Sequence, residues 1–403
     1  MLSRKQMRFL SDDLPRMTIV EGCISSGKTW VCNHKAVEHI ITNYKGAGLI
    51  FFIGRTLTTL ERNVLEPLAL TYKRKFSYST AQKRASLCDI RIDLEGCNDL
   101  SAESKIRGST AEFIYGDELT LWNLPFLNRC MGSLRTPDAC FLGTTNPDNP
   151  YNFIKTNYLD RQEELGLRRV RFEMDDNPTL TEAYKEQVSR EYTGVFHDRF
   201  IKGLWVRAEG IIYPMFQPDR HVTDDLPRIH SIGFAVDVGH SNATVFLAIG
   251  EGEDGRAYVL EEYYHSGHES RVTLSPAAYA REFIRFRDDM FSRFPYAEQD
   301  LTYIDPSALG FKAQLVEAGE TYTRAAYNDV VPGIQTVASV IDNDLLRVSP
   351  RCDSLIREFA AYVWDEKAAA RGEDKPVKED DHALDALRYY FASQRNAWTS
   401  RRV

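Results

Sequence analysis

Several features that mark membrane, secreted or disulfide-rich proteins are missing from this chain of 403 residues. No apolar run approaches the roughly 20 residues that a membrane-spanning helix needs, and residues 1–6 lack the apolar core of a secretory signal. The seven cysteines form no C-x-x-C pair and are odd in number, which argues against a disulfide framework and against a zinc site. We therefore expect no membrane partner, a cytoplasmic location and reduced thiols.

A strong excess of charge of one sign is missing as well. The formal net charge is −8, which does not favour a protein that coats nucleic acid through bulk electrostatics, although a local basic groove is compatible with it. The composition is 43% hydrophobic and 27% charged, as in ordinary soluble globular proteins. A chain of this length exceeds one ordinary core, and we expect two domains.

Residues 22–29 match the phosphate-binding pattern G-x-x-x-x-G-K-[ST] at every fixed position. In such a loop, consecutive backbone N–H groups face an anion at the start of a helix. We expect Lys28 to neutralise the β and γ phosphates of a nucleoside triphosphate, and the Thr29 hydroxyl to bind the accompanying Mg²⁺. The candidate nucleotide-binding residues are Gly22, Cys23, Ile24, Ser25, Ser26, Gly27, Lys28 and Thr29.

The segments around this loop predict an α/β domain with a doubly wound, mostly parallel sheet. An apolar strand at 17–20 precedes the loop, and a helical pattern follows it. The continuous apolar run 49–53 predicts a strand that is buried on both faces, followed by a helix over 56–70. The run 140–147 predicts a further strand that ends in small polar residues, where a nucleotide sensor or a hinge would lie.

Residues 113–118 form a mostly apolar run that ends in two acids and resembles a Walker B strand. In that role Asp117 holds Mg²⁺ through its water shell, and Glu118 activates the water that attacks the γ phosphate. Gly116 departs from the unbroken apolar run of this motif. The alternative is that the two acids only cap the next helix.

Proline-containing residues 210–227 follow a helical stretch and predict the end of the first domain. We place a P-loop ATPase domain at 1–211, a linker at 212–228 and a second α/β domain at 229–403.

Three separate segments of the second domain each offer a carboxylate. Apolar strands deliver Asp237 and Asp305, and a polar segment near the C-terminus holds Asp381 and Asp385, four residues apart, with His382 between them. A helix would project both of these acids from one face. Strand and helix carboxylates together suit two divalent cations that cleave a phosphodiester. The alternative is that each acid occupies an ordinary turn.

Taken together, these motifs resemble the large terminase subunit of tailed bacteriophages, the motor and nuclease that packages viral DNA. The most distinctive match is the segment Asp-His-Ala-Leu-Asp-Ala-Leu-Arg-Tyr at 381–389. The resemblance covers nearly the whole chain, and its other matches lie at 22–29, 114–118, 143–147, 201–205, 329–334 and 362–365.

The resemblance implies a ribonuclease H-like nuclease fold for the second domain. Its metal ligands would be Asp237, Asp305 and the pair Asp381 and Asp385, with His382 nearby, and either member of the pair is a candidate for direct metal binding. The expected cofactors are ATP and Mg²⁺, with Mn²⁺ as an alternative at the nuclease site.

The same resemblance implies how the chain works and with what. It would hydrolyse ATP to translocate double-stranded DNA into a procapsid through the portal, and would cut concatemeric DNA with a two-metal endonuclease. The implied partners are viral double-stranded DNA, the portal protein, the small terminase subunit and further copies of this chain in a ring. The expected location is the host cytoplasm, transiently on the procapsid portal.

Two further residues take roles from the resemblance. Arg107 precedes Glu118 by eleven residues, as does the arginine that family members supply to a neighbouring subunit, with Arg129 and Arg135 as alternatives. Gln6 corresponds to an upstream glutamine that reads the adenine edge. Many relatives carry an arginine inside the phosphate loop, where this chain has Cys23 and Ile24, so an arginine contribution from the loop itself is not expected.

Three competing functions remain at this stage. An ATP-dependent helicase or DNA remodeller would share the first domain but would need no carboxylate cluster in the second. A small-molecule P-loop kinase would hydrolyse ATP independently of DNA. A DNA-binding scaffold with an ATP-driven assembly switch would keep its function after Glu118→Ala. Divalent-metal nuclease activity separates the packaging enzyme from the remodeller.

Overall fold

The computed structural model describes residues 2–239, 243–266, 274–379 and 381–401. Its contacts divide the chain into two compact units. The first consists of Met1–Lys185, Gly194–Arg207 and Ala370–Glu373, and the second of Glu186–Thr193, Ala208–Ala369 and Asp374–Val403. No helix in the described part of the chain is long and apolar enough to cross a membrane.

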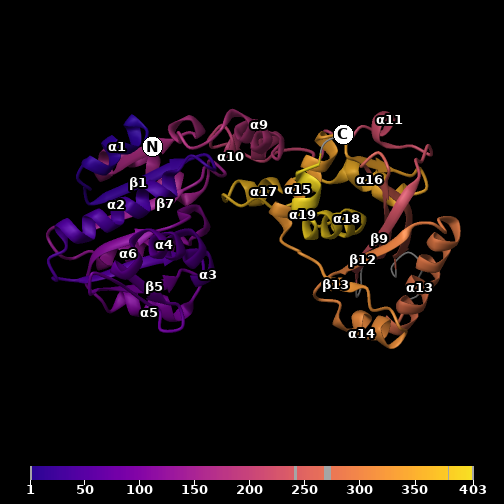
Figure 1. Ribbon diagram of the computed structural model, residues 1–403, viewed down its shortest axis with the longest axis horizontal. Coiled ribbons are helices and arrows are strands. Elements are labelled where there is room, and N and C mark those ends of the chain that lie inside the picture. The colour runs from indigo at the N-terminus through magenta and orange to yellow at the C-terminus, as the bar shows by residue number, and fades with distance from the viewer. Residues whose placement is uncertain (1, 240–242, 267–273, 380, 402–403) are drawn as a thin grey trace. The chain divides into compact units, whose positions relative to one another are not determined.

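The first unit, indigo to magenta in Figure 1, is built on an eight-stranded sheet with the order β3-β4-β5-β2-β6-β7-β1-β8. The pairs among β5, β2, β6, β7, β1 and β8 are all parallel, and β3 and β4 add an antiparallel edge. The strands are β1 (Met17–Gly22), β2 (Leu49–Gly54), β3 (Phe76–Ser79), β4 (Arg84–Leu87), β5 (Ile90–Gly96), β6 (Ala111–Gly116), β7 (Cys140–Thr145) and β8 (Arg168–Phe172).

Helices cover both faces of this sheet. Phe52 packs into one hydrophobic core, whereas Phe51 and Ile53 pack into another, so β2 is buried on both sides, as the continuous apolar run predicts. The helices are α1 (Arg4–Ser11), α2 (Lys28–Asn43), α3 (Leu57–Leu60), α4 (Glu66–Tyr72), α5 (Leu100–Arg107), α6 (Leu124–Ser133), α7 (Phe153–Asn157), α8 (Gln162–Leu165), α9 (Glu182–Arg190) and α10 (Gly194–Phe200).

The segment predicted as one helix over 56–70 is helical but not uniform. A π-helical turn, η1 (Glu61–Leu65), separates α3 from α4. Short 3-10 turns complete the described part of this unit: η2 (Lys73–Lys75), η3 (Leu119–Leu121), η4 (Leu159–Arg161) and η5 (Met174–Asp176).

The second unit is built on a six-stranded sheet with the order β13-β12-β9-β10-β11-β14. The neighbours β9, β10 and β11 form an antiparallel meander, as predicted, and β12 pairs with β9 in parallel. The strands are β9 (Ile229–Val238), β10 (Ala243–Gly252), β11 (Ala257–Ser266), β12 (Glu298–Ile304), β13 (Thr323–Ala325) and β14 (Leu346–Val348).

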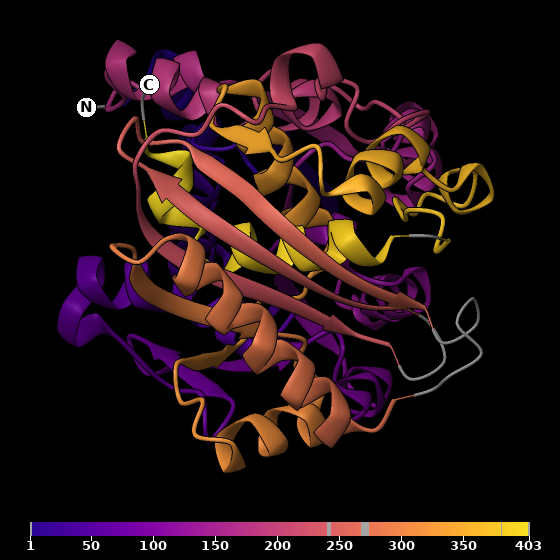
Figure 2. The ribbon, with the colours of Figure 1, turned by 90° about the vertical axis from the view of Figure 1, so that its right-hand side faces the viewer.

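Helices also cover both faces of the second sheet, which Figure 2 shows with the long helix α13 in orange and α18 in yellow. Phe234 of β9 packs on Phe283 of α13, whereas a Cβ on the adjacent Gly233 would meet Tyr390 of α18. The helices are α11 (Pro218–His221), α13 (Pro276–Arg293), α14 (Leu309–Glu317), α15 (Val330–Asp342), α16 (Asp353–Ala361), α17 (Glu366–Ala369), α18 (His382–Ser393) and α19 (Arg395–Thr399).

Residues 212–228, which the sequence predicts as a linker, belong to the second unit. The Ile212 N–H donates to the Tyr362 carbonyl at 2.9 Å, and Val222 forms a bridge with Val348. This segment is therefore anchored to the second unit at both of these points.

Candidate nucleotide and metal sites

The phosphate-loop residues lie between β1 and α2, at the carboxyl ends of the parallel strands. Gly22 ends β1, and a Cβ there would lie 2.0 Å from the carbonyl oxygen of Phe172. Gly27 has a φ of 79°, a left-handed conformation that favours glycine. The backbone therefore requires glycine at both fixed positions of the motif.

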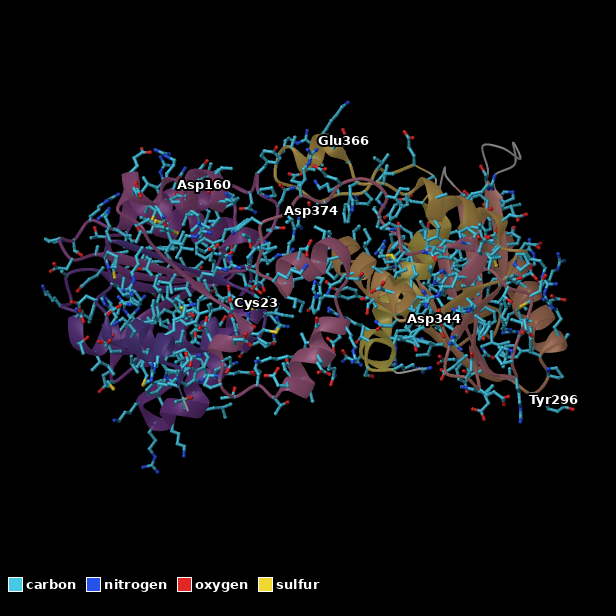
Figure 3. All side chains as sticks on the ribbon, turned by 90° about the horizontal axis from the view of Figure 1, so that it is seen from above. Cys23, Asp160, Tyr296, Asp344, Glu366 and Asp374 are labelled. Carbon is cyan, nitrogen blue, oxygen red and sulfur yellow. The ribbon has the colours of Figure 1, made fainter. Side chains whose placement is uncertain are left out.

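The loop closes on itself through short hydrogen bonds. The Ser26 hydroxyl donates to the Cys23 carbonyl at 2.9 Å, and the Ile24 N–H donates to the Phe200 carbonyl at 2.9 Å. Cys23, labelled in Figure 3, is buried, and burial raises the pKa of its thiol. The positions that carry an arginine in many relatives are thus occupied here by a neutral thiol and an aliphatic side chain.

Three side chains from outside the motif contact this loop. Asn177 donates to the Ser25 carbonyl at 2.8 Å, and the Tyr184 hydroxyl lies 3.1 Å from the Ser25 hydroxyl oxygen. Gln6 is buried, and its Nε2 would lie 2.9 Å from a Cβ on Gly27. The structure therefore places Gln6 against the loop, and it adds two residues that no sequence motif marks.

Lys28 and Thr29 open helix α2. Lys28 is buried, and burial lowers the pKa of its ammonium group. Its Nζ donates to the Cys23 carbonyl at 3.1 Å and to the side-chain oxygen of Asn146, which follows β7. The polar end of β7 therefore reaches the phosphate-loop lysine, as a sensor or hinge would.

The two acids of the Walker B-like strand follow β6 directly. Asp117 is buried, and its carboxylate oxygens accept from the Thr144 hydroxyl at 2.6 Å and from Asn63 Nδ2 at 2.9 Å. Glu118 has a φ of 56°, an uncommon conformation for a residue with a side chain. Asn63 is a contact that the sequence reasoning missed.

Burial, together with the charge of Asp117, raises the pKa of Glu118. The positive charges that oppose this shift belong to Arg62, Lys28 and Arg55. A Cβ on Gly116 would lie 2.8 Å from the Trp122 ring, so tight packing explains the glycine that interrupts the motif.

The structure does not bring the predicted trans-acting arginine to these acids. Arg107 is the last residue of α5, is exposed, and makes no hydrogen bond or ion pair with the described residues. Of the alternatives, Arg129 is half-buried on α6, and exposed Arg135 donates to the Gly132 carbonyl at 3.1 Å.

In the second unit, neighbouring strands bring two of the predicted acids together. Asp237 lies near the end of β9 and Asp305 follows β12, and the Asp305 N–H donates to the carbonyl of Val236 at 3.2 Å. Nδ1 of His382 lies 3.0 Å from Oδ2 of Asp237. The Tyr389 hydroxyl donates to Asp305 Oδ2 at 3.3 Å. Helix α18 therefore contacts both strand acids.

The electrostatics show a cluster of negative charge. Burial raises the pKa of Asp237, and the charges of Asp385 and Asp305 add to this effect, while the hydrogen bond from His382 opposes it. The same hydrogen bond raises the pKa of His382. Asp237, Asp305 and Asp385 are therefore close enough to act on one another.

Asp381 and Asp385 differ in their place on α18. Asp385 lies in the first turn, whereas Asp381 is the N-cap residue and lies just outside the helix. Lys378 Nζ lies 3.1 Å from Asp381 Oδ2 and 3.2 Å from Asp385 Oδ2. Arg388 Nη2 lies 2.9 Å from Asp385 Oδ1. Each oxygen of the Asp385 carboxylate is thus paired with a different cation.

These residues fit a divalent cation by their chemistry, because Mg²⁺ and Mn²⁺ prefer carboxylate oxygens. Among the described residues, no group of three His, Cys, Asp or Glu side chains is already arranged to hold a metal ion. Lys378 is 57% exposed on its side chain, so it is free to move aside, and metal binding would replace its charge at Asp385.

Two buried carboxylates hold α18 in place, and no pattern in the sequence marks either of them. Glu358 of α16 accepts from the Leu384 N–H at 2.8 Å, at the start of α18, and burial raises the pKa of Glu358 to about 8. Glu262 of β11 accepts from the N–H groups of Ser354 and Leu355, at the start of α16, at 2.7 and 3.0 Å. Each carboxylate caps the next helix toward the acid cluster.

The fold and the sites define a class of protein: a P-loop ATPase domain joined in one chain to a ribonuclease H-like nuclease domain. The comparisons with known proteins identify the family within this class. Residues 19–218 match the family model "Terminase large subunit, T4likevirus-type, N-terminal", and residues 318–393 match "Terminase RNAseH like domain".

Solved structures agree over the whole length. The large terminase of a thermophilic bacteriophage is 33% identical, with 97% of this chain and 98% of that chain covered and a TM-score of 0.87. The same phage protein in complex with ATP-gamma-S is 32% identical, with 98% and 99% covered and a TM-score of 0.86. The chain belongs to the large terminase family, which confirms the predicted family and fold class.

A curated relative extends this result to a second phage. The large terminase subunit of Escherichia phage T5 is 27% identical over 197 residues, and this match spans 45% of this chain and 41% of the T5 protein. Asp237 and Asp305 lie outside both segments that match the family models. Their assignment therefore rests on the sequence pattern and on the geometry described above.

Proposed function

We propose that this chain is the DNA-packaging motor of a tailed phage. It hydrolyses ATP to move double-stranded DNA through the portal into a procapsid, and it cuts the concatemeric DNA with a divalent-metal nuclease. The observation that carries this proposal is the presence, in one terminase chain, of a complete phosphate loop and of a buried acid cluster formed by Asp237, Asp305 and Asp385.

In the first unit the residues act on the phosphates of ATP. Bound ATP and Mg²⁺ would supply the transferable phosphoryl group and a cation that neutralises it. Lys28 would leave Asn146 to neutralise the β and γ phosphates, and Thr29 would turn its hydroxyl toward the cation. Asp117 would order the water around that cation, and Glu118 would take the proton of the attacking water.

In the second unit the residues act on a phosphodiester. Bound Mg²⁺ or Mn²⁺ would polarise the scissile phosphate and stabilise the attacking and leaving oxygens. Asp237, Asp305 and Asp385 would hold the cations through their oxygens. His382 orients Asp237 through the hydrogen bond from Nδ1, and Asp381 serves the same site as a partner of Lys378.

The proposed assembly is a ring of copies on the portal, loaded with DNA by a small terminase subunit. Arg107 would then complete the ATP site of the neighbouring copy. Its exposure supports this role, and an arginine supplied in this way changes turnover by about 10³–10⁵-fold. Gln6, which contacts the phosphate loop, would face the adenine side of the nucleotide.

DNA cleavage by the full chain tests the nuclease part and separates it from a helicase or remodeller. Plasmid DNA is incubated with Mg²⁺ or Mn²⁺ and with wild type, Asp237→Ala or Asp305→Ala. A matched control is Asp300→Ala, because Asp300 lies on strand β12, which ends just before Asp305. We expect cutting by wild type and by the control alone, whereas cutting that survives both cluster substitutions would remove the nuclease assignment.

Packaging itself is tested with procapsids of the phage that encodes this chain. Procapsids, DNA, ATP and the full chain are combined, and DNA that resists added nuclease is measured. We expect protected DNA with wild type and none with Glu118→Gln. ATP hydrolysis without any DNA protection, also after the small subunit is added, would contradict the motor.

A further inference from the structure

The π-helical turn η1 (Glu61–Leu65) interrupts a helix beside the nucleotide site. Such turns insert one extra residue into an α-helix, and they often occur at functional sites. Here both Val64 and Leu65 are fully buried in the core, although they are consecutive. The preceding residues, Arg62 and Asn63, are thereby turned toward the acids that follow β6.

Three hydrogen bonds that involve side chains fix Asn63. Its Nδ2 donates to Asp117 Oδ2 at 2.9 Å, and its Oδ1 accepts from Arg62 Nε at 3.2 Å. Its backbone carbonyl accepts from Asn33 Nδ2 at 3.1 Å, and the Asn33 side-chain oxygen in turn accepts from the Tyr115 hydroxyl at 2.7 Å. A guanidinium only donates, so the amide oxygen of Asn63 must face Arg62 and its NH₂ group must face Asp117.

Asp117 is therefore held from two sides. Thr144 donates to one carboxylate oxygen at 2.6 Å, and Asn63 donates to the other at 2.9 Å. These two donors come from different elements, the end of β7 and the π-turn. The same π-turn carries Arg62, whose positive charge lowers the pKa of Glu118 against the effect of burial.

We propose that Asn63 is a positioning residue of the ATPase site, which acts by orienting the carboxylate of Asp117 toward the Mg²⁺ of bound ATP. The proposal rests on the proposed ATPase function of the first unit. Partners of this kind fix the direction of a metal-binding carboxylate, and their loss typically weakens metal affinity or activity by about 10–100-fold. Asn63 touches neither the phosphate loop nor the nucleotide pocket residues Gln6 and Tyr184 in any described contact.

The test measures the Mg²⁺ dependence of the full chain with two variants. Asn63→Ala removes the donor, and Asn63→Asp replaces it by a carboxylate that repels Asp117. The Mg²⁺ concentration that half-saturates ATP hydrolysis is measured at fixed ATP. Binding of a fluorescent ADP analogue in EDTA is measured in parallel and reports the phosphate loop without metal.

The matched control is Asn128→Ala. Asn128 lies on α6 of the same unit and accepts from the Tyr158 hydroxyl at 2.9 Å, so this variant also loses a side-chain hydrogen bond. The half-saturating Mg²⁺ concentration does not depend on the amount of folded protein, so a partly unfolded variant still gives a valid reading.

We expect the half-saturating Mg²⁺ concentration to rise about ten-fold or more in Asn63→Ala and further in Asn63→Asp, with metal-free ADP binding unchanged. Unchanged Mg²⁺ dependence in both variants, or an equal loss of metal-free ADP binding, would overturn the role of Asn63. Absence of ATP hydrolysis by wild type would instead overturn the proposed function, so the two failures are distinguishable.

Discussion

Gly333 of α15 packs directly against Arg388 of α18, and Gly333→Ala tests this contact. A Cβ at Gly333 would lie 2.4 Å from Cγ and 2.7 Å from Cδ of Arg388. Arg388 is buried and is pinned at its far end, where Nη1 donates to the Asn328 carbonyl at 2.8 Å and Nη2 pairs with Asp385 at 2.9 Å. The arginine therefore has little freedom to move away from a new methyl group.

Two opposing effects set the size of the change in stability. Alanine is favoured over glycine inside a helix by about 1 kcal/mol, whereas overpacking of a buried contact costs about 1–3 kcal/mol. Because the distances are far below van der Waals contact, we expect overpacking to win by about 1–2 kcal/mol. For a unit of this size that corresponds to a fall in melting temperature of about 2–8 °C.

The same displacement reaches the metal site. Moving Arg388 disturbs its ion pair with Asp385, so we expect DNA cleavage to fall by about ten-fold or more while ATP hydrolysis by the first unit is unchanged. Calorimetry and the two activity assays measure these effects. The control is Gly310→Ala on α14, where the nearest atom to a new Cβ is 3.7 Å away. A Gly333→Ala protein as stable and as active in cleavage as this control would refute the reasoning.

Three further predictions concern charges in the second unit. Three arginines donate to Asp344 and, against the effect of burial, lower its pKa to about 2: Arg220, Arg256 and Arg347. This contribution is present above about pH 4 and is lost as the pH falls through about 2, so Asp344→Asn should lose about 1–2 kcal/mol in urea unfolding at pH 7 and progressively less below pH 4. Because burial raises the pKa of Glu358 to about 8, the free energy of unfolding should fall as the pH rises from about 4 to 8, and Glu358→Gln should flatten that decline in urea unfolding at pH 6 and 9. Lys378→Met removes the cation that competes for Asp385, so calorimetric titration should show tighter Mn²⁺ binding, and unchanged or weaker binding would contradict the competition.

Local patterns made much of the fold predictable. The phosphate loop could be recognised because its glycines and lysine stand at fixed spacings that the backbone geometry requires. The strand that contains Phe51 and Phe52 could be recognised because both of its faces are buried, which produces a continuous apolar run. Motif spacing and apolar runs therefore predicted the two sheets and the ends of the strands that carry the sites.

Contacts between distant segments were not predictable in this way. The π-turn leaves Leu57, Leu60, Val64 and Leu68 at helical spacing, so the pattern of residues 56–70 reads as one continuous helix and does not mark Asn63. Glu358 and Glu262 read as ordinary acids, because only the tertiary fold places them at the starts of α18 and α16. The N-cap place of Asp381 likewise depends on where α18 begins.

The central claim is that one chain carries two separate active sites, and one measurement tests it most directly. ATP hydrolysis and Mn²⁺-dependent DNA cleavage are measured on the same preparations of wild type, Glu118→Gln and Asp305→Asn. We predict that Glu118→Gln loses hydrolysis and keeps cleavage, and that Asp305→Asn loses cleavage and keeps hydrolysis. Loss of both activities in either folded variant, or of neither in both, would contradict the account.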